Sequence, residues 1–309
     1  MKTVFGSCWE SFDPAPAPLM KALADLGFGM VRLMGMWPQI NPKPGLFIWD
    51  QNDKSVDAIK GAGMKLYHSP YWAPAHASGG LPTYEPYTAG CSFDLGGGKI
   101  RFASERSYCS DPAPIDPRKS YLFGKALGRR YGSDIDYYAP PINEPGPIYY
   151  PPAIRGGDWG AQLAREIIAP FVAGVRSAHP PAVFVGPEAD TWDVLDGILR
   201  HEAASGERWF DYVSRHPYAW DTSRPFNGFP EDSYERLDQF AAVASDYPAR
   251  PEWITEIGSG GAPDAKVMDF CREMIRREVP VVLFHNSDMW LDDKNKLTAL
   301  GARMKGLLA

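Results

Sequence analysis

The stretch that decides the fold runs from Met30 to Trp72 and reads MVRLMGMWPQINPKPGLFIWDQNDKSVDAIKGAGMKLYHSPYW. Its two apolar runs, 30–37 and 64–72, predict strands. The segment 53–61 between them predicts a helix, with Asp53 as its N-terminal cap and Gly61 or Gly63 as its stop. A strand, a helix and a second strand in this order indicate a parallel βαβ unit.

The same alternation extends outward to both ends of the chain. Strands are predicted over 4–9, 30–37, 64–72, 135–142, 182–185, 210–215, 252–255 and 280–284. Helices are predicted over 18–26, 53–61, 117–131, 159–178 (with a bend near Pro170), 194–204, 233–247, 264–277 and 297–308. Eight strand–helix pairs in 309 residues predict a single (β/α)8 TIM barrel spanning residues 1–309 as one domain. An open doubly wound sheet is the alternative, but no glycine-rich phosphate turn follows the first strand.

One connection is much longer than the rest. Residues 73–116, rich in Gly, Pro, Ser and Tyr, separate the third strand from its helix. In a barrel this extended loop lies at the C-terminal face, where active sites are built, so we expect it to form a wall of a substrate cleft. A surface insertion without function is the alternative.

Composition narrows the classes of function. Hydrophobic residues make up 44% and charged residues 23%, which is typical of a globular protein, and the net charge of −6 argues against general binding to nucleic acid or anionic membranes. No apolar run is long enough to cross a membrane. Aromatic residues reach 13% and fit either sugar stacking or a large aromatic core. Nothing suggests a cofactor, and we expect a monomer.

Four cysteines leave the compartment open. Cys8 and Cys271 lie in apolar patterns and are expected to be buried thiols, whereas Cys91 and Cys109 flank a loop and could be bridged. Secretion is expected if that bridge forms or if a leader is missing from this sequence, and a cytoplasmic location otherwise.

Two glutamates at the ends of predicted strands are the candidate catalytic residues. Glu144 follows the fourth predicted strand, and Glu256 ends the seventh. An ionisable side chain is tolerated at a barrel mouth but not inside an apolar strand, so both carboxyls are expected to face one cleft. Two facing carboxyl groups are what glycoside cleavage requires, one as a proton donor and the other as a nucleophile or base. Helix caps or salt-bridge partners are the alternative interpretation.

The string Ile142-Asn143-Glu144-Pro145 resembles the Asn-Glu-Pro signature of clan A glycoside hydrolases, which are retaining enzymes on (β/α)8 barrels. The segment 253–258, Trp-Ile-Thr-Glu-Ile-Gly, is similar to the nucleophile segment on strand seven of that clan. The resemblance covers the whole chain in order and is greatest to families 39 and 5.

The resemblance implies roles residue by residue. Glu144 would be the general acid and then the base, and Glu256 the nucleophile, kept ionised by Arg32 and by the hydroxyl of Tyr218. Asn143 would bind the sugar 2-hydroxyl, and His216 would orient a carboxylate or bind sugar. The aromatic and histidine side chains expected to contact sugar are Trp290, stacked under it, and Trp72, His68 and Trp9 on the floor of the cleft. Each of these residues could instead be structural.

The predicted activity is hydrolysis of β-linked glycosidic bonds by double displacement, with an endo-acting attack on an oligo- or polysaccharide. Two alternatives stay open. A non-catalytic carbohydrate-binding barrel would keep the aromatic lining. A metal-dependent barrel hydrolase would use His68, His76, His216 or His285, although no His-x-His pair follows the first strand.

Overall fold

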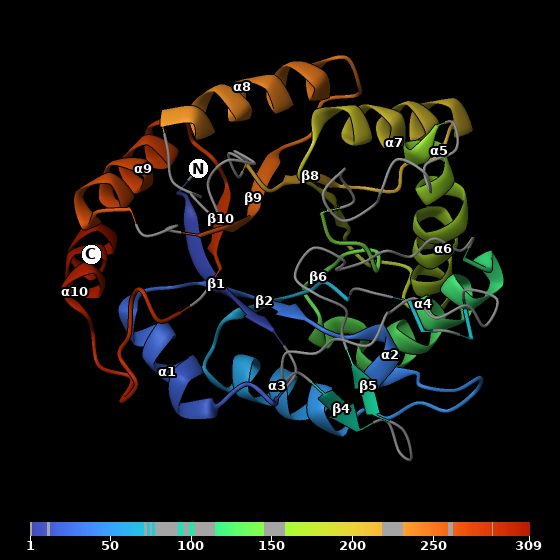
Figure 1. The fold of residues 1–309 in the computed structure, drawn as a ribbon, viewed down its shortest axis with the longest axis horizontal. Helices are drawn as coiled ribbons and strands as arrows, with labels where there is room; N and C mark the ends of the chain where they lie inside the picture. The colour runs from blue at the N-terminus through green and yellow to red at the C-terminus, as the bar shows by residue number, and fades with distance from the viewer. Residues whose placement is uncertain are drawn as a thin grey trace.

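Eight parallel strands surrounded by helices form the protein in a computed structural model (Figure 1). The structure describes residues 2–10, 13–70, 73–74, 76–77, 92–94, 99–101, 115–144, 158–217, 231–258, 262–285 and 287–309. The barrel strands are β1 (Val4–Glu10), β2 (Met30–Met34), β3 (Lys65–His68), β6 (Tyr137–Tyr138), β7 (Val185–Ala189), β8 (Tyr212–Arg215), β9 (Glu252–Ile257) and β10 (Val281–Phe284). Their arrangement confirms the predicted (β/α)8 barrel.

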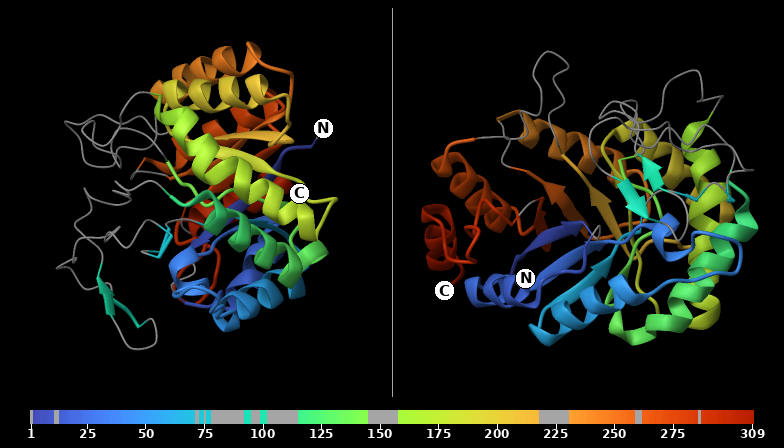
Figure 2. Two further views of the ribbon diagram at one scale, coloured as in Figure 1. Left: turned by 90° about the vertical axis from the view of Figure 1, so that its right-hand side faces the viewer. Right: turned by 60° about the horizontal axis from the view of Figure 1, so that its bottom comes forward.

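The helices alternate with the strands and form the outer ring (Figures 1 and 2). They are α1 (Ala17–Leu26), α2 (Trp37–Ile40), α3 (Asp50–Gly61), α4 (Pro117–Tyr131), α5 (Trp159–Leu163), α6 (Ala169–Ala178), α7 (Trp192–Ser205), α8 (Glu231–Ser245), α9 (Asp264–Arg276) and α10 (Ala299–Leu308). A short 3₁₀ turn, Gly132–Asp134, follows α4. None of the helices in these ranges is long and apolar enough to span a bilayer.

The strands are joined in the order β6-β3-β2-β1-β10-β9-β8-β7, every pair parallel. The ring closes between β6 and β7 through a single bridge, Tyr138 to Phe184. Two main-chain hydrogen bonds support this seam. The amide of Tyr138 donates to the carbonyl of Val183 at 2.9 Å, and that of Glu144 donates to the carbonyl of Glu188 at 3.0 Å.

Two apolar layers hold the barrel together. The inner layer fills the ring of strands with side chains such as Met30, Tyr67 and Trp253. The outer layer lies between strands and helices and is much larger. Side chains alternate between the layers along each strand, so the face on which a residue lies decides whether it can reach the barrel axis.

The fourth strand and the long helix are shorter than the sequence predicted. Strand β6 covers only two residues, because Pro140 and Pro141 follow it and cannot donate to a ladder. The helix expected over 159–178 divides into α5, a π-helical turn (Ala164–Ile168) and α6, and Pro170 lies in the first turn of α6. The missing N–H of Pro170 explains why the regular ladder is interrupted just before it.

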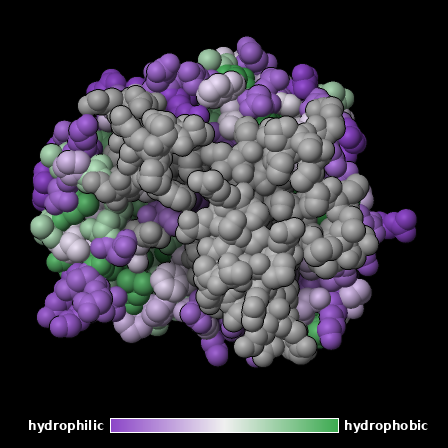
Figure 3. Space-filling model, viewed as in Figure 1, coloured by the Kyte–Doolittle hydropathy of each residue, from purple (hydrophilic) through white to green (hydrophobic). Residues whose placement is uncertain are grey.

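The long connection after β3 lies largely outside the described residues. Its described part includes an antiparallel hairpin of β4 (Ser92–Asp94) and β5 (Lys99–Arg101), which stands apart from the barrel strands (Figure 2). Cys8 and Cys271 are buried free thiols, as predicted, whereas Cys91 and Cys109 lie outside the described residues. Where described residues are visible around the rim of the face in Figure 3, hydrophilic ones predominate.

Helices α4 and α6 pack with their backbones in close approach. A Cβ atom added at Gly174 of α6 would lie 2.1 Å from the carbonyl oxygen of Tyr121 in α4, and one at Gly124 would lie 2.4 Å from that of Phe171. Glycine is therefore required at this helix crossing, which sets the outer wall beside the seam.

Gly174→Ala is expected to lower the free energy of unfolding by about 1–3 kcal/mol, because the methyl group must force the two helices apart. Gly306→Ala is the matched control, since nothing lies within 4 Å of its added Cβ in α10. That substitution should raise stability by up to about 1 kcal/mol through helix propensity. Urea unfolding of the two variants checks the expectation, and equal effects would contradict it.

Candidate active site

Glu144 and Glu256 meet at the C-terminal end of the strands. Glu256 is the second-last residue of strand β9. Glu144 follows β6 after a short segment and has a positive φ of 45°. Both are buried, with exposures of 3% and 6%. One carboxylate oxygen of each lies within 4.8 Å of the other and of a nitrogen of His216. The structure thus brings together the two carboxyls that the sequence placed at one mouth.

Arg32 binds the nucleophile candidate from β2. Its Nη1 donates to Glu256 Oε2 at 2.6 Å, and its Nη2 donates to Asn143 Oδ1 at 2.6 Å. Arg32 is fully buried, and the same Nη2 lies 2.9 Å from Glu188 Oε2. Burial by itself lowers the pKa of Arg32, but Glu188 and Glu256 raise it well above its usual value. The guanidinium is therefore a permanent cation between two carboxylates.

Glu188 was not predicted from the sequence, yet it lies at the centre of the cluster. It is fully buried, and it accepts hydrogen bonds from the hydroxyls of Tyr67 and of Thr255, the latter at 2.9 Å. Burial by itself raises the pKa of Glu188, but the charge of Arg32 and the hydrogen bonds from His216 and Tyr67 lower it to about 2. Glu188 is therefore an ionised carboxylate at the floor of the site.

His216 bridges the carboxyls. Its Nδ1 lies 2.9 Å from Glu144 Oε1 and 3.9 Å from Glu256 Oε2, and its Nε2 lies 2.7 Å from Glu188 Oε2. Burial by itself lowers the pKa of His216, but Glu256, Glu144 and Glu188 together raise it to about 9. These contacts place His216 against the carboxyls, and its role in orienting them stays a prediction.

A further buried carboxyl, Asp190, follows β7 beside the cluster. It is fully buried, and neither carboxylate oxygen has a hydrogen-bond partner among the described residues. Burial is the main cause that raises the pKa of Asp190, and the charge of Glu144 raises it further, to about 7. Sequence reasoning did not single out Asp190.

His68 does not reach the site, which corrects the prediction that it lines the floor. It pairs with Leu33, whereas its neighbour Tyr67 pairs with Arg32 and faces the barrel axis. The ring of His68 is buried in the outer layer, with Nε2 3.1 Å from Asn52 Oδ1. Burial lowers its pKa to about 3, so it is a neutral histidine of the core.

Trp290 also differs from its predicted role as a sugar platform. Its ring is fully buried and packs edge-on against Phe28 and Phe284, with centroids 5.7 and 4.8 Å away. No ring face is therefore open to a sugar. Trp9 is half-buried, and its Nε1 donates to the carbonyl of Asp13 at 3.1 Å. Trp72 and Tyr218 lie outside the described residues.

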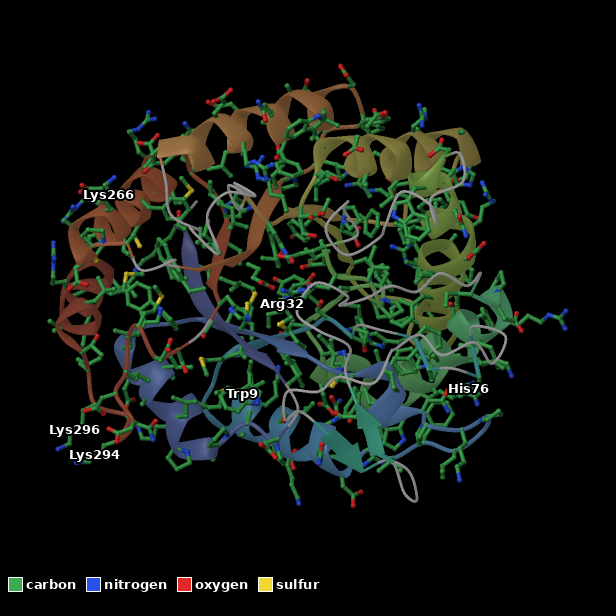
Figure 4. All side chains as sticks on the ribbon, viewed as in Figure 1. Trp9, Arg32, His76, Lys266, Lys294 and Lys296 are labelled. Atoms are coloured by element: carbon green, nitrogen blue, oxygen red, sulfur yellow. The ribbon has the colours of Figure 1, made fainter. Side chains whose placement is uncertain are left out.

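The histidines considered as metal ligands do not gather. His68 lies in the outer layer, and the Nε2 of His76 donates to the carbonyl of Asn41, far from the central Arg32 (Figure 4). Among the described residues, only His216 joins the carboxyls, and His68, His76 and His285 belong to no group of potential metal ligands. One atom each of Glu144, His216 and Glu256 could reach a cation. Their oxygens and nitrogens are instead engaged by Arg32 and Glu188, so we assign this group to ion pairing.

Comparison with known proteins adds to this geometry. No protein-family model matches the sequence, and no curated protein shows significant similarity to it. Solved structures do match. A monomeric β-xylosidase from Caulobacter crescentus CB15 superimposes with a TM-score of 0.70 at 14% identity, over 99% of this chain and 68% of that one. The chain shares the barrel fold of this β-xylosidase.

Two further structures extend the comparison. The GH39 enzyme from Xanthomonas axonopodis pv. citri gives a TM-score of 0.70 at 14% identity, over 99% of this chain and 66% of that one. A GH30 endoxylanase from Clostridium papyrosolvens C71 gives 0.54 at 17% identity, over 100% and 71%. The chain thus spans about two thirds of the length of these structures. At such identities the likeness establishes the fold, in agreement with the resemblance of the sequence to clan A.

Acid is expected to destabilise the protein through His68. The folded state keeps His68 neutral down to about pH 3, whereas the unfolded chain takes up a proton below about 6.5. Stability is therefore lost as the pH falls below 6.5. In urea unfolding, His68→Gln should lose about 2 kcal/mol less than the unmodified protein between pH 7 and pH 5. Equal losses in the two proteins would contradict this assignment.

Proposed function

We propose that the protein is a retaining glycoside hydrolase that cleaves β-linked glycosidic bonds by double displacement. The observation that carries the proposal is the approach of Glu144 and Glu256, with one oxygen of each inside 4.8 Å, at the carboxyl ends of the barrel strands. Retaining enzymes need carboxyls about 5–5.5 Å apart, whereas inverting enzymes leave about 6.5–9.5 Å for a water molecule.

In the first step an oxygen of Glu256 bonds to the anomeric carbon while the glycosidic C–O bond breaks. The proton of Glu144 passes to the departing oxygen, so the negative charge moves from Glu256 to Glu144. In the second step Glu144 takes a proton from water, whose oxygen bonds to the anomeric carbon and releases Glu256. Arg32, 2.6 Å from Glu256 Oε2, keeps the nucleophile ionised before the attack.

Asn143 is proposed to bind the 2-hydroxyl of the sugar. Arg32 already donates to its Oδ1, which fixes the orientation of the amide. The Nδ2 group, a donor, then remains for the sugar, and this contact strengthens in an oxocarbenium-like transition state. His216 is proposed to act on the carboxyls rather than on the sugar. Trp72 and Tyr218 remain candidates for sugar contacts.

The substrate is proposed to be a β-linked oligo- or polysaccharide attacked internally, with no cofactor and with the protein acting as a monomer. The matched structures include a β-xylosidase, an endoxylanase and an exo-β-1,4-mannosidase, so xylan and mannan belong in the first panel. Product sizing separates the modes of attack, since an endo-acting enzyme releases a range of oligosaccharides early, whereas an exo-acting one releases a single small sugar.

Replacement of the carboxyls tests the mechanism. On an aryl β-glycoside, Glu256→Ala should lower kcat by at least about 10³-fold, because no other group attacks the anomeric carbon. Azide should rescue this variant and give a glycosyl azide of inverted configuration. Glu144→Ala should lower kcat/KM mainly with a poor leaving group, which needs the proton of Glu144, and should lower kcat with every substrate because the second step loses its base. Azide should give the retained product with this variant.

Glu252→Gln is the matched control, because Glu252 lies on the same strand β9 at its opposite end and pairs with Arg215. It should keep near-normal kcat. Near-normal turnover in Glu256→Ala would contradict the proposal. Sugar binding in calorimetry without turnover by the unmodified protein would instead support a non-catalytic binding barrel, and loss of activity in chelator would support a metal-dependent hydrolase.

A further inference from the structure

Glu188 is surrounded by charged and polar partners. Its two oxygens face Tyr67, Thr255, His216 and Arg32, which come from four different strands or strand ends. It is completely buried, so a sugar in the cleft would meet Glu144 and Glu256 rather than Glu188. Glu188 is therefore placed to act on its neighbours.

The charges of the cluster balance when Glu144 is protonated, as an acid catalyst requires, Asp190 is neutral and His216 is an imidazolium. With Glu144 protonated, the carboxylates of Glu188 and Glu256 require two cations. Arg32 supplies one, and His216 must supply the other as an imidazolium. A neutral cluster is strongly favoured at a buried site, because an unpaired charge there costs several kcal/mol.

The imidazolium of His216 lies where it can interact with both Glu144 and Glu256. Its Nδ1 lies 2.9 Å from Glu144 Oε1 and 3.9 Å from Glu256 Oε2, so one N–H group faces both carboxyls. In the double displacement the negative charge leaves Glu256 and appears on Glu144. A cation between them stabilises both arrangements without moving far.

We propose that Glu188 is a positioning residue that holds His216 as an imidazolium, the shared counter-ion of the negative charge as it passes between Glu256 and Glu144. The counter-ion role rests on the proposed glycosidase function. The hold of Glu188 on His216 does not, because it follows from the 2.7 Å contact between His216 Nε2 and the Oε2 atom of the buried Glu188.

The groups around His216 agree with the proposal. The carboxyls that face it are those of Glu144, Glu188, Glu256 and, beyond them, Asp190, while Arg32 is the cation of the cluster. Burial by itself lowers the pKa of His216, and the three glutamates reverse this and raise it to about 9. A neutral imidazole whose Nδ1 accepts a hydrogen bond from a protonated Glu144 is the competing arrangement, and such a ring would take up a proton only below neutral pH.

Histidine NMR tests the hold on His216 without any substrate. In ¹⁵N-histidine-labelled protein, the signal lost in His216→Asn identifies the ring, and we expect it to stay protonated through pH 8. Glu188→Gln should lower its pKa by about 1–3 pH units, whereas Glu188→Asp, which keeps the charge, should restore most of the shift. A ring that is neutral at pH 7 in the unmodified protein overturns the proposal even if Glu188→Gln fails to fold.

Glu202→Gln is the matched control, because Glu202 is another buried glutamate, paired with Arg250 at 2.8 Å and remote from His216. It should cost stability and leave the His216 titration where it is. An equal shift in Glu202→Gln and Glu188→Gln would overturn the proposal, since the effect would then come from loosened packing.

Kinetics then test the counter-ion. Glu188→Gln should lower kcat about 10²-fold and move the alkaline limb of the kcat profile to lower pH, because His216 loses its charge earlier. Loss of activity with an unmoved limb would mean a structural role and would overturn the counter-ion. If the NMR titration of His216 is as expected but the protein hydrolyses no glycoside, the proposed function is refuted. The hold of Glu188 on His216 then still stands.

Discussion

The buried guanidinium of Arg32 is the interaction on which the rest of the site depends. It enters from β2 and binds carboxylates that come from β7 and β9, on the far side of the ring. A buried cation without its partners would be very costly, and so would each carboxylate without the cation. Strands distant in the sequence must therefore meet in one register, and the arrangement of the carboxyls around Arg32 follows from the pairing of these charges.

Much of the site could be predicted because its residues stand where an apolar strand ends in a charge. Glu144 and Glu256 carry this signal, and Arg32 and His216 follow from strand position and resemblance. Glu188 carries no such signal, because simple alternation from Val185 would turn it to the outer face. A register shift in β7 between Gly186 and Ala189, with a positive φ of 59° at Glu188, turns it inward instead.

The incorrect predictions have a related cause. His68 and Tyr67 are adjacent and both suit a binding site, and only the pairing of Tyr67 with Arg32 across the sheet decides which faces the axis. Trp290 follows the last strand, where a ring can lie over the mouth or between strand and helix. Its contacts with Phe28 and Phe284 show the second case. Periodicity locates strands but leaves such choices to tertiary packing.

The seam between β6 and β7 both closes the barrel and holds the backbone of Glu144 in place. A single bridge closes the ring there, and the amide of Glu144 supplies one of the few main-chain bonds across it. Thermal opening at this joint would carry Glu144 away from Glu256 while the remaining ladders and helices stayed intact. Local opening at this seam would therefore separate the paired carboxyls without global unfolding, and the close α4–α6 crossing, which its glycines permit, would oppose that opening.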